Sequence, residues 1–402
     1  MTTPDAQHLP PASPGHAPWA LFRLICGHIC LHSSMAGLRM AAPLFALSQG
    51  YSALSVGFLL ALFSLSQVFL AIPAGRYADK HGLRRPIALG VVVACSGAAF
   101  SVLFPRFEVL CFSALCLGGA TGASAIALQR HVGRVASSTL ELKQVFGWLS
   151  IGPAMANFVG PVAVGLLIDH AGYRWAFLFS ATLPLCTWLF VRHTRELPSM
   201  PAPLGGATAQ AWALLGEPRM RRLLLVNWLL SSCWDVHTFV VPLLGHERGL
   251  SASVIGTLLG SFAVAAACVR VLMPVLAAHL REWVVVSSAM VATALLFSIY
   301  PFMVSPWTMG LCSVLLGLAL GTVQPMIMST LHQITPHHLH GQAIALRLMS
   351  INLSSVLMPM LFGTAGVVVG VSVVFWTVGA MVGLGARAAW HLRPPPSGLQ
   401  GN

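Results

Sequence analysis

Charged residues are scarce in this sequence. Asp, Glu, Lys and Arg make up 8% of its 402 residues and hydrophobic residues make up 56%, whereas soluble domains carry roughly 25% charged residues. The mean hydropathy is +0.80. Apolar runs long enough to cross about 30 Å of hydrocarbon as a helix recur along the whole chain. This composition excludes a soluble globular protein, and the continuous apolar runs exclude a membrane barrel of short alternating strands.

Motifs of enzymatic chemistry are absent as well. The sequence has no Gly-x-x-x-x-Gly-Lys-Ser/Thr loop that would bind nucleotide phosphates. No Ser, His and Asp set and no pair of carboxylates is expected to converge on one site. The nine cysteines form no Cys-x-x-Cys pair and lie in apolar runs, where cysteine behaves as a small apolar side chain. We therefore expect no enzyme activity and no cofactor.

Two groups of histidine and cysteine resemble sets of metal ligands. Over residues 26–32, Cys and His alternate at a spacing of two, which spreads them around a helix instead of converging them. The His-rich segment 337–340 lies in a predicted inner loop, where basic residues serve topology. We expect no dedicated metal site at either place.

Twelve apolar runs are predicted to be membrane-spanning helices. The first 18 residues are polar and proline-rich and show no secretory signal, so the first run is kept as a helix. The predicted spans are residues 19–47, 52–74, 86–104, 107–129, 143–168, 175–193, 222–245, 252–278, 283–303, 306–331, 341–364 and 367–391.

The longest polar segment separates the sixth span from the seventh. It runs from Arg192 to Arg222 and contains Pro198, Pro201 and Pro203, which are typical of a linker. The sequence therefore predicts an all-α integral membrane protein with two six-helix bundles. The predicted parts are a disordered N-terminal tail (1–18), a first bundle (19–193), a linker (194–221), a second bundle (222–391) and a C-terminal tail (392–402).

The distribution of Lys and Arg predicts the orientation of the chain. Most basic residues fall in loops on one side of the predicted bundle, namely Arg76, Lys80, Arg84, Arg85, Arg134, Lys143, Arg192, Arg195, Arg219, Arg221, Arg222, Arg281 and Arg393. The loops on the other side hold Arg106, Arg174 and Arg248. By the positive-inside rule, the first side and both termini are cytoplasmic. The net charge of +12 thus reflects topology in a lipid bilayer, and we expect a monomer in the cell inner membrane with no nucleic-acid partner.

The two halves are related by an internal repeat. An offset of 199 residues pairs Pro43 with Pro242 and Gly50 with Gly249. The same offset, or one residue less, also gives the pairs Gly57 and Gly256, Gly118 and Gly317, and Pro161 and Pro359. Two copies of a six-helix unit with the same membrane orientation form a parallel repeat, which is typical of one large class of transporters.

A charge-dense turn lies between the second and third predicted spans. Over residues 75–86 the pattern Gly-x-x-x-Asp-Lys-x-Gly-x-Arg-Arg is formed by Gly75, Asp79, Lys80, Gly82, Arg84 and Arg85. It resembles the loop between helices 2 and 3 of the major facilitator superfamily of transporters, except that Leu83 stands where that family usually has another basic residue. The resemblance implies a conformational switch in which Asp79 attracts cations or the positive end of a neighbouring helix. The alternative is a basic loop that serves topology alone.

The fifth span carries a second resemblance. Gly147, Ala156, Gly160, Pro161 and Gly165 nearly reproduce the antiporter motif of drug:proton antiporters, although Ala156 and a valine replace two of its glycines. Small residues four apart allow close helix packing, and proline bends the helix. Gly and Pro are also frequent in membrane helices without such a role. The arginine that these antiporters usually carry in helix 4 is missing from segment 115–122, so we do not expect proton coupling through it.

Asp235 is the carboxylate expected deepest in the membrane. Counted from Arg222, it lies thirteen residues (235 − 222) into its span, about 20 Å at 1.5 Å per residue. A lone carboxylate in a medium of low dielectric constant holds its proton more firmly than in water, so Asp235 could exchange a proton near neutral pH. His237 follows two residues later, on a different side of the helix.

The first span has a polar face that contains His28, His32 and Arg39. The repeat offset places Arg39 opposite Thr238 and therefore at a depth similar to that of Asp235. Helices 1 and 7 of the superfamily face each other across a central cavity, so the resemblance implies an Arg39–Asp235 pair that substrate or protonation breaks. A permanent structural ion pair is the alternative. The histidines could carry protons, bind substrate or pack as polar groups.

Other polar side chains inside apolar spans are candidates for the cavity or its gates, because charge and unpaired polarity at depth are costly. They are Asn157, Gln324, Arg270, Arg347 and Asn352. Pro325 frees a backbone carbonyl near Gln324, a common way to line an aqueous path.

Together these patterns predict a secondary transporter that moves a small organic solute by alternating access. Proton-coupled efflux, with Asp235 as the proton acceptor and Arg39 as its partner, is the first hypothesis. The second is uptake or facilitated movement of an organic anion held by Arg39. A transporter-like sensor without turnover is the third.

Overall fold

The described residues of the computed structural model are 18–135, 139–197, 213–276, 281–335 and 340–393, and all their regular structure is helical. The long helices are α1 (Pro18–Ser48), α2 (Ala53–His81), α3 (Arg84–Leu103), α4 (Phe107–Val135), α5 (Thr139–Ala171), α6 (Tyr173–Val191), α8 (Pro218–Glu247), α9 (Ala252–Leu276), α10 (Glu282–Ile299), α11 (Pro306–Ile334), α12 (His340–Val369) and α13 (Val371–Trp390). Two short 3-10 helices, η1 (Leu214–Gly216) and η3 (Tyr300–Phe302), precede α8 and follow α10.

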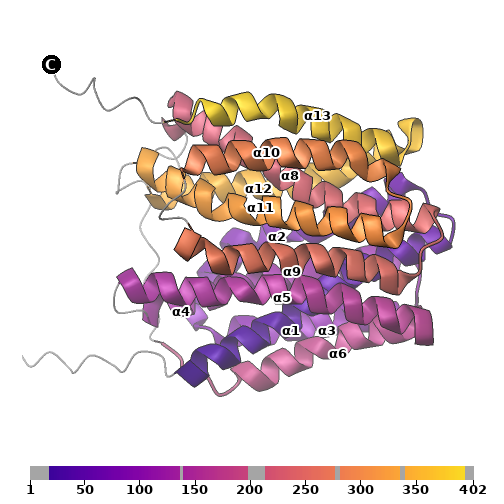
Figure 1. Cartoon of the computed structure of the whole chain (residues 1–402). Coiled ribbons are helices and arrows are strands. Elements are labelled where there is room, and N and C mark those ends of the chain that lie inside the picture. Colours follow the sequence, from indigo (N-terminus) through magenta and orange to yellow (C-terminus); the bar gives the residue numbers. More distant parts are fainter. Residues whose placement is uncertain (1–17, 136–138, 198–212, 277–280, 336–339, 394–402) are drawn as a thin grey trace, which may run out of the picture.

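These helices make the chain a multi-pass membrane protein. Eleven of them are long and apolar enough to cross a membrane, and α12 contains a shorter apolar stretch, Leu346–Phe362. They lie side by side along one common direction (Figure 1). The prediction of an all-α fold with twelve spans is confirmed.

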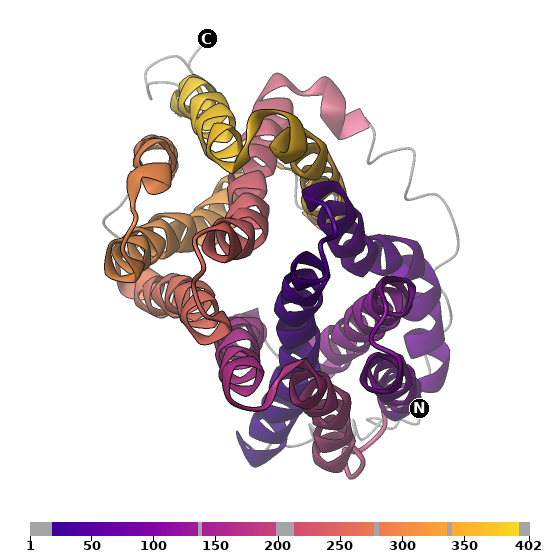
Figure 2. The same cartoon turned by 90° about the vertical axis from the view of Figure 1, so that its right-hand side faces the viewer.

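Turns repeat from one bundle to the other. Gly50 between α1 and α2 and Gly249 between α8 and α9 have φ values of 82° and 68°, and they are 199 residues apart. Gly172 and Gly370, with φ values of 87° and 84°, are 198 residues apart. These offsets are the ones found in the sequence. The two pseudo-symmetric bundles are α1–α6 and α8–α13, and Figure 2 shows the indigo-to-pink helices beside the salmon-to-yellow ones.

Several helices extend beyond their predicted spans, as α2 and α8 illustrate. The second span was predicted to end at residue 74, but α2 continues to His81, and α8 begins at Pro218 instead of residue 222. Hydropathy marks the part of a helix inside hydrocarbon, whereas its hydrogen-bonded turns continue into the polar flanks. The segment predicted as a charge-dense turn is therefore helical up to His81, and only Gly82 and Leu83 separate α2 from α3.

The two ends of the molecule differ. The start of α1 and the end of α13 lie at one end (left in Figure 1), which we call the basic end. The turn between α2 and α3 is at this end too, since it lies beside Trp188 and Glu196 at the end of α6. The α5–α6 and α8–α9 turns lie at the opposite end, which we call the far end. The bundles contact each other mainly through α5 with α9 and α2 with α12.

Close packing and a capped helix join α5 to α9 at the far end. A Cβ on Gly165 would lie 2.5 Å from the carbonyl oxygen of Ala252, so only glycine fits there. Asp169 Oδ1 and Oδ2 accept hydrogen bonds from the backbone N–H groups of Ala252 (3.0 Å) and Ser253 (2.7 Å). A carboxylate at a helix N-terminus satisfies unpaired donors and the helix dipole. Asp169 of one bundle therefore caps a helix of the other.

Candidate functional site

A cavity of about 240 Å³ lies between the two bundles. Its walls come from α1, α2 and α5 of the first bundle and from α8, α9 and α12 of the second. The polar side chains that line it are His32, Arg39, Ser64, Gln67, Asn157, Thr238, Asn352 and Ser355. Apolar and aromatic groups complete the lining, so the cavity suits a small molecule with both polar and apolar parts.

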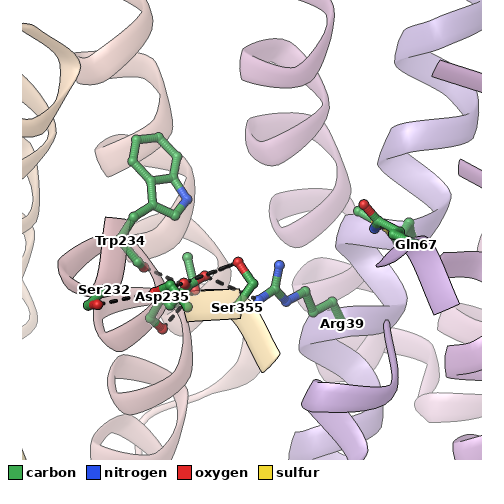
Figure 3. Close-up of polar contacts among 9 residues, drawn as sticks. Arg39, Gln67, Ser232, Trp234, Asp235 and Ser355 are labelled. Atoms are coloured by element: carbon green, nitrogen blue, oxygen red, sulfur yellow. Dashed lines mark hydrogen bonds and ion pairs between the residues drawn. The ribbon is translucent and has the colours of Figure 1, made fainter. Parts of the chain in front are cut away.

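Arg39 and Asp235 meet at the boundary between the bundles. Arg39 Nη2 lies 3.8 Å from Asp235 Oδ1, and Figure 3 shows Arg39 reaching from α1 toward Asp235 on α8. The ion pair expected between these residues is present. Its length exceeds the roughly 2.7–3.2 Å of an N–H···O hydrogen bond. The Arg39 side chain is 25% exposed and that of Asp235 only 6%, so Arg39 is the member of the pair that a solute can reach.

Two serines of α12 hold the Asp235 carboxylate. Ser354 Oγ donates to Oδ2 (3.0 Å), and Ser355 Oγ lies 3.0 Å from Oδ1 and 3.1 Å from Oδ2. On α8, the hydroxyl of Ser232 lies 3.1 Å from that of Ser354. A buried charge is tolerated only when it is paired and hydrogen-bonded. Asp235 thereby links α8 to α1 through charge and to α12 through hydroxyls.

An aromatic wall stands beside this ion pair. The rings of Trp234 and Phe262 lie 4.5 Å apart at 65°, and both line the cavity. The guanidinium carbon of Arg270 lies 5.3 Å from the centre of the Trp234 ring, which is a cation–π contact. Arg270 is therefore held against the wall of the cavity.

The predicted histidines have different positions. His32 lines the cavity. His28 is buried with its ring 5.7 Å from that of His32, but it does not line the cavity. His237 lies inside the second bundle, where Nε2 is 3.0 Å from Ser313 Oγ and the ring stacks 4.1 Å from Phe262. The structure thus brings His32, but neither His28 nor His237, to the cavity.

Only some of the other polar candidates line the cavity. Asn157 and Asn352 line the cavity from opposite bundles, whereas Gln324 is exposed on α11 and is not part of the lining. Arg347 is 5% exposed, and its Nε donates to Asn227 Oδ1 at 3.1 Å inside the second bundle.

The turn between α2 and α3 is held by a residue that follows α6. Gly82 has a φ of 75°, which an L side chain rarely adopts. The Glu196 carboxylate accepts hydrogen bonds from the backbone N–H groups of Leu83 (2.8 Å) and Arg84 (2.6 Å), at the start of α3. Lys80, Arg84 and Arg85 line a depression of about 490 Å³ around Glu196 at the basic end.

Gly75 and Asp79 both lie on α2, one turn apart. The carbonyl oxygen of Gly75 accepts a hydrogen bond from Arg130 Nη1 of α4 at 3.0 Å. The motif glycine thus lies at a helix contact, as its small size predicts.

The α5 motif lies along two helix contacts. A Cβ on Gly160 would lie 2.6 Å from the carbonyl oxygen of Ser33 on α1. Ala156 is fully buried, and Pro161 lines the cavity. Gly165 contacts α9, and Gly147 lies on the same helix nearer the basic end. The motif therefore packs α5 between α1 of its own bundle and α9 of the other.

Within the described part of the chain, no group of three His, Cys, Asp or Glu side chains has the arrangement of a metal site. His337 and His338 lie outside the described residues.

Three important residues escaped the sequence-based reasoning. Ser355 could have been found from the repeat, because the offset of 198 pairs it with Asn157, which was already a candidate for the cavity (157 + 198 = 355). Glu196 and Asp169 gave no such signal. Each is an acidic residue near a predicted helix end, and its partner lies more than 80 residues away in the sequence.

Comparison with protein families finds a match that covers most of the chain. The chain matches the family model described as Major Facilitator Superfamily over residues 24–284 and 223–402.

Comparison with curated proteins finds relatives along most of the chain. It is 25% identical over 359 residues to "Multidrug resistance protein MdtG" of Salmonella typhimurium, which covers 85% of this chain and 86% of the relative. The protein of that name from Dickeya zeae is 24% identical over 388 residues, covering 92% and 90%.

Solved transporters share the fold. A point mutant of the nucleoside transporter NupG superposes with a TM-score of 0.77 at 14% identity, covering 93% of this chain and 99% of that one. The human organic anion transporter MFSD10 gives a TM-score of 0.67 at 19% identity, covering 95% and 100%.

Proposed function

Because the chain belongs to the major facilitator superfamily, we propose that it exports a small organic solute in exchange for protons by alternating access. The chain is a secondary transporter and not an enzyme. Relatives named as multidrug resistance proteins support the outward direction. The observation that carries the proposal is the Asp235 carboxylate, which is buried at the boundary between the bundles and pairs with Arg39 of the other bundle.

The proposed membrane is the cell inner membrane, with the basic end in the cytoplasm. The concentration of Lys and Arg in the loops of that end supports this orientation. The far end would then face outward. The contacts between α5 and α9, with the Asp169 cap, join the two bundles on that side. We propose that the molecule works as a monomer within the lipid bilayer.

Proton coupling would act through the ion pair. At the observed separation, the attraction between Arg39 and an ionised Asp235 is worth about 4 kcal/mol for an effective dielectric constant of about 20. Protonation of Asp235 abolishes this attraction, which frees Arg39 and loosens α1 from α8. A solute that binds only while the pair is intact would favour the deprotonated state. The protonated and the solute-bound forms would then exclude each other, as exchange of solute for protons requires.

The Gly75–Arg85 segment would act as the conformational switch at the cytoplasmic end. The Glu196 cap on α3 and the Arg130 contact with Gly75 hold this segment against its own bundle. We propose that Asp79, Lys80, Arg84 and Arg85 make and break contacts with the other bundle during transport.

Transport into proteoliposomes tests the proposal. When the transporter is inserted inside out and the vesicle interior is acidic, the wild type should accumulate solute. Asp235→Asn should lose this accumulation but keep solute counterflow. Glu108→Gln, at an exposed position in the first turn of α4, is the matched control and should keep both activities. Accumulation that persists in Asp235→Asn would remove Asp235 as the proton carrier.

A second candidate is downhill movement of an organic anion without protons. The partial exposure of Arg39 in the cavity favours it. In that case an imposed pH gradient would drive no accumulation, even in the wild type.

A further inference from the structure

Two arginines of the second bundle, one half-buried and one buried, contact the same helix, α8. Arg270 on α9 contacts Trp234, and Arg347 on α12 contacts Asn227, seven residues earlier along α8. Arg347 is 5% exposed and donates from Nε to Asn227 Oδ1. Arg270 lies over the face of the Trp234 ring. Both positive charges are therefore fixed inside the protein by their neighbours.

No acidic side chain in the described part of the chain balances these charges. Among the side chains that the structure describes, no carboxylate lies within 4.0 Å of Arg270 or Arg347. Arg270 Nε and Asn227 Nδ2 are buried and have no hydrogen-bond partner among the described residues. As far as the structure describes it, the cluster thus contains two cations and unused N–H donors but no anion.

Ordinary structural roles do not account for this arrangement. An arginine that extends to the lipid headgroups would be exposed, but Arg347 is not. The contact with the Trp234 ring offsets only a small part of what it costs to move a cation out of water. Buried charges without a protein partner in membrane proteins mark sites for ions or substrates.

The arginines lie at the margin of the central cavity, on the side of the basic end. Arg270 is seven residues beyond the cavity residue Ala263 along α9, about 10 Å toward the basic end. Arg347 precedes the cavity residue Ile351 by four residues along α12, about 6 Å. Trp234 connects the two regions, since it lines the cavity and carries Arg270 on its ring.

We propose that Arg270 and Arg347 bind the acidic group of the transported solute, and that this solute is an organic anion. Guanidinium groups suit carboxylates and phosphates because their parallel N–H groups match two oxygens. The apolar part of the solute lies against Trp234 and Phe262. The proposal rests on the proposed transport of an organic solute through the central cavity, and it adds the chemical class of that solute.

Thermal stability of the detergent-purified protein tests this proposal without any gradient. The probes are 1-naphthoate, 1-naphthyl phosphate and, as a cation of matched shape, 1-naphthylmethylamine. The variants are Arg270→Gln, Arg347→Gln and their double variant, with Arg106→Gln in a loop at the far end as the control. Isothermal titration calorimetry measures the affinity for each probe.

We expect at least one of the two anions, and not the amine, to raise the Tm of the wild type and of Arg106→Gln. Each single variant should bind that anion at least tenfold more weakly, and the double variant about a hundredfold. Without a probe, the variants should melt at or above the wild-type temperature, because an uncompensated buried charge has been removed. A structural role for the arginines predicts the opposite shift, so variants with a lower Tm and unchanged anion affinity would overturn the proposal.

Three further outcomes also decide against it. Equal stabilisation by the amine, or stabilisation by neither anion, would show that the cavity does not select an acidic group. If phosphatidylglycerol added to the micelles stabilises the wild type and prevents anion binding, the cluster is a lipid site. None of these results depends on Asp235, so failure here is distinguishable from failure of proton coupling.

Discussion

The Asp169 cap should stabilise the contact between the two bundles at the far end. Its carboxylate accepts two backbone hydrogen bonds from α9, and these bonds exist only while α5 and α9 are in contact. Loss of a helix N-cap costs about 0.5–2 kcal/mol, and loss of the charge near the helix dipole costs about 0.3–1 kcal/mol. Asp169→Ala should therefore favour the far-end-open state by about 2 kcal/mol, or about thirtyfold. A state populated at about 1% would rise to roughly a fifth of the molecules.

Distances between spin labels at the far end measure this population. Suitable positions in a cysteine-free background are Gln49, exposed after α1, and Val304, which is 76% exposed before α11. Asp169→Ala should add a longer-distance component, and Asp169→Asn, which keeps one acceptor oxygen, a smaller one. Glu108→Ala, at an exposed acidic residue of the same end, should leave the distribution unchanged. An unchanged distribution in Asp169→Ala would refute the role of the cap.

Three further predictions address the ion pair, the turn and the driving force. Arg39→Gln and Asp235→Asn should each lower the Tm, and the double variant should recover part of the loss, because a single removal leaves the other buried group without its partner; additive losses would contradict the pair. Gly82→Ala should destabilise the protein by about 1–3 kcal/mol in denaturation experiments, since its Cβ would collide with the Glu196 carboxylate and its φ is positive; wild-type stability would show that the turn tolerates a side chain. Export of an organic anion in exchange for a proton moves two charges across the membrane per cycle. A membrane potential of 100 mV, negative inside, should therefore supply about 5 kcal/mol for export without a pH gradient. Transport currents that do not respond to the potential would contradict anion export.

The fold was largely predictable because its signals are local. Each span is an apolar run, and the repeat appears as Gly and Pro at fixed offsets. The turn glycines Gly50 and Gly249, which the repeat aligns in the sequence, both have a positive φ. Helix ends were less predictable, since α2 and α8 continue into polar flanks where hydropathy carries no information.

The ion pair was predictable from depth, but its surroundings were not. The repeat places Arg39 and Asp235 at one level, and family resemblance places their helices opposite each other. Which hydroxyls complete the shell depends on the rotation of α12 about its axis, and no count along the sequence gives that angle. His237 illustrates the same point: two residues along a helix place its ring near the opposite side from Asp235, in contact with Ser313.

Contacts between charged residues and distant helix ends were beyond sequence reasoning. Glu196 follows α6 yet caps α3, and Asp169 of the first bundle caps α9 of the second. Both contacts depend on tertiary structure, since any exposed acid near a helix end has the same local pattern.

Proton release on solute binding tests the central claim most directly. Solute is added to purified protein in weakly buffered solution, and released protons are measured from acidic to alkaline pH. We expect the wild type to release protons over the range in which Asp235 is protonated, and Asp235→Asn to bind solute without release. Solute binding with equal proton release in both proteins, or with none in either, would contradict proton exchange at Asp235.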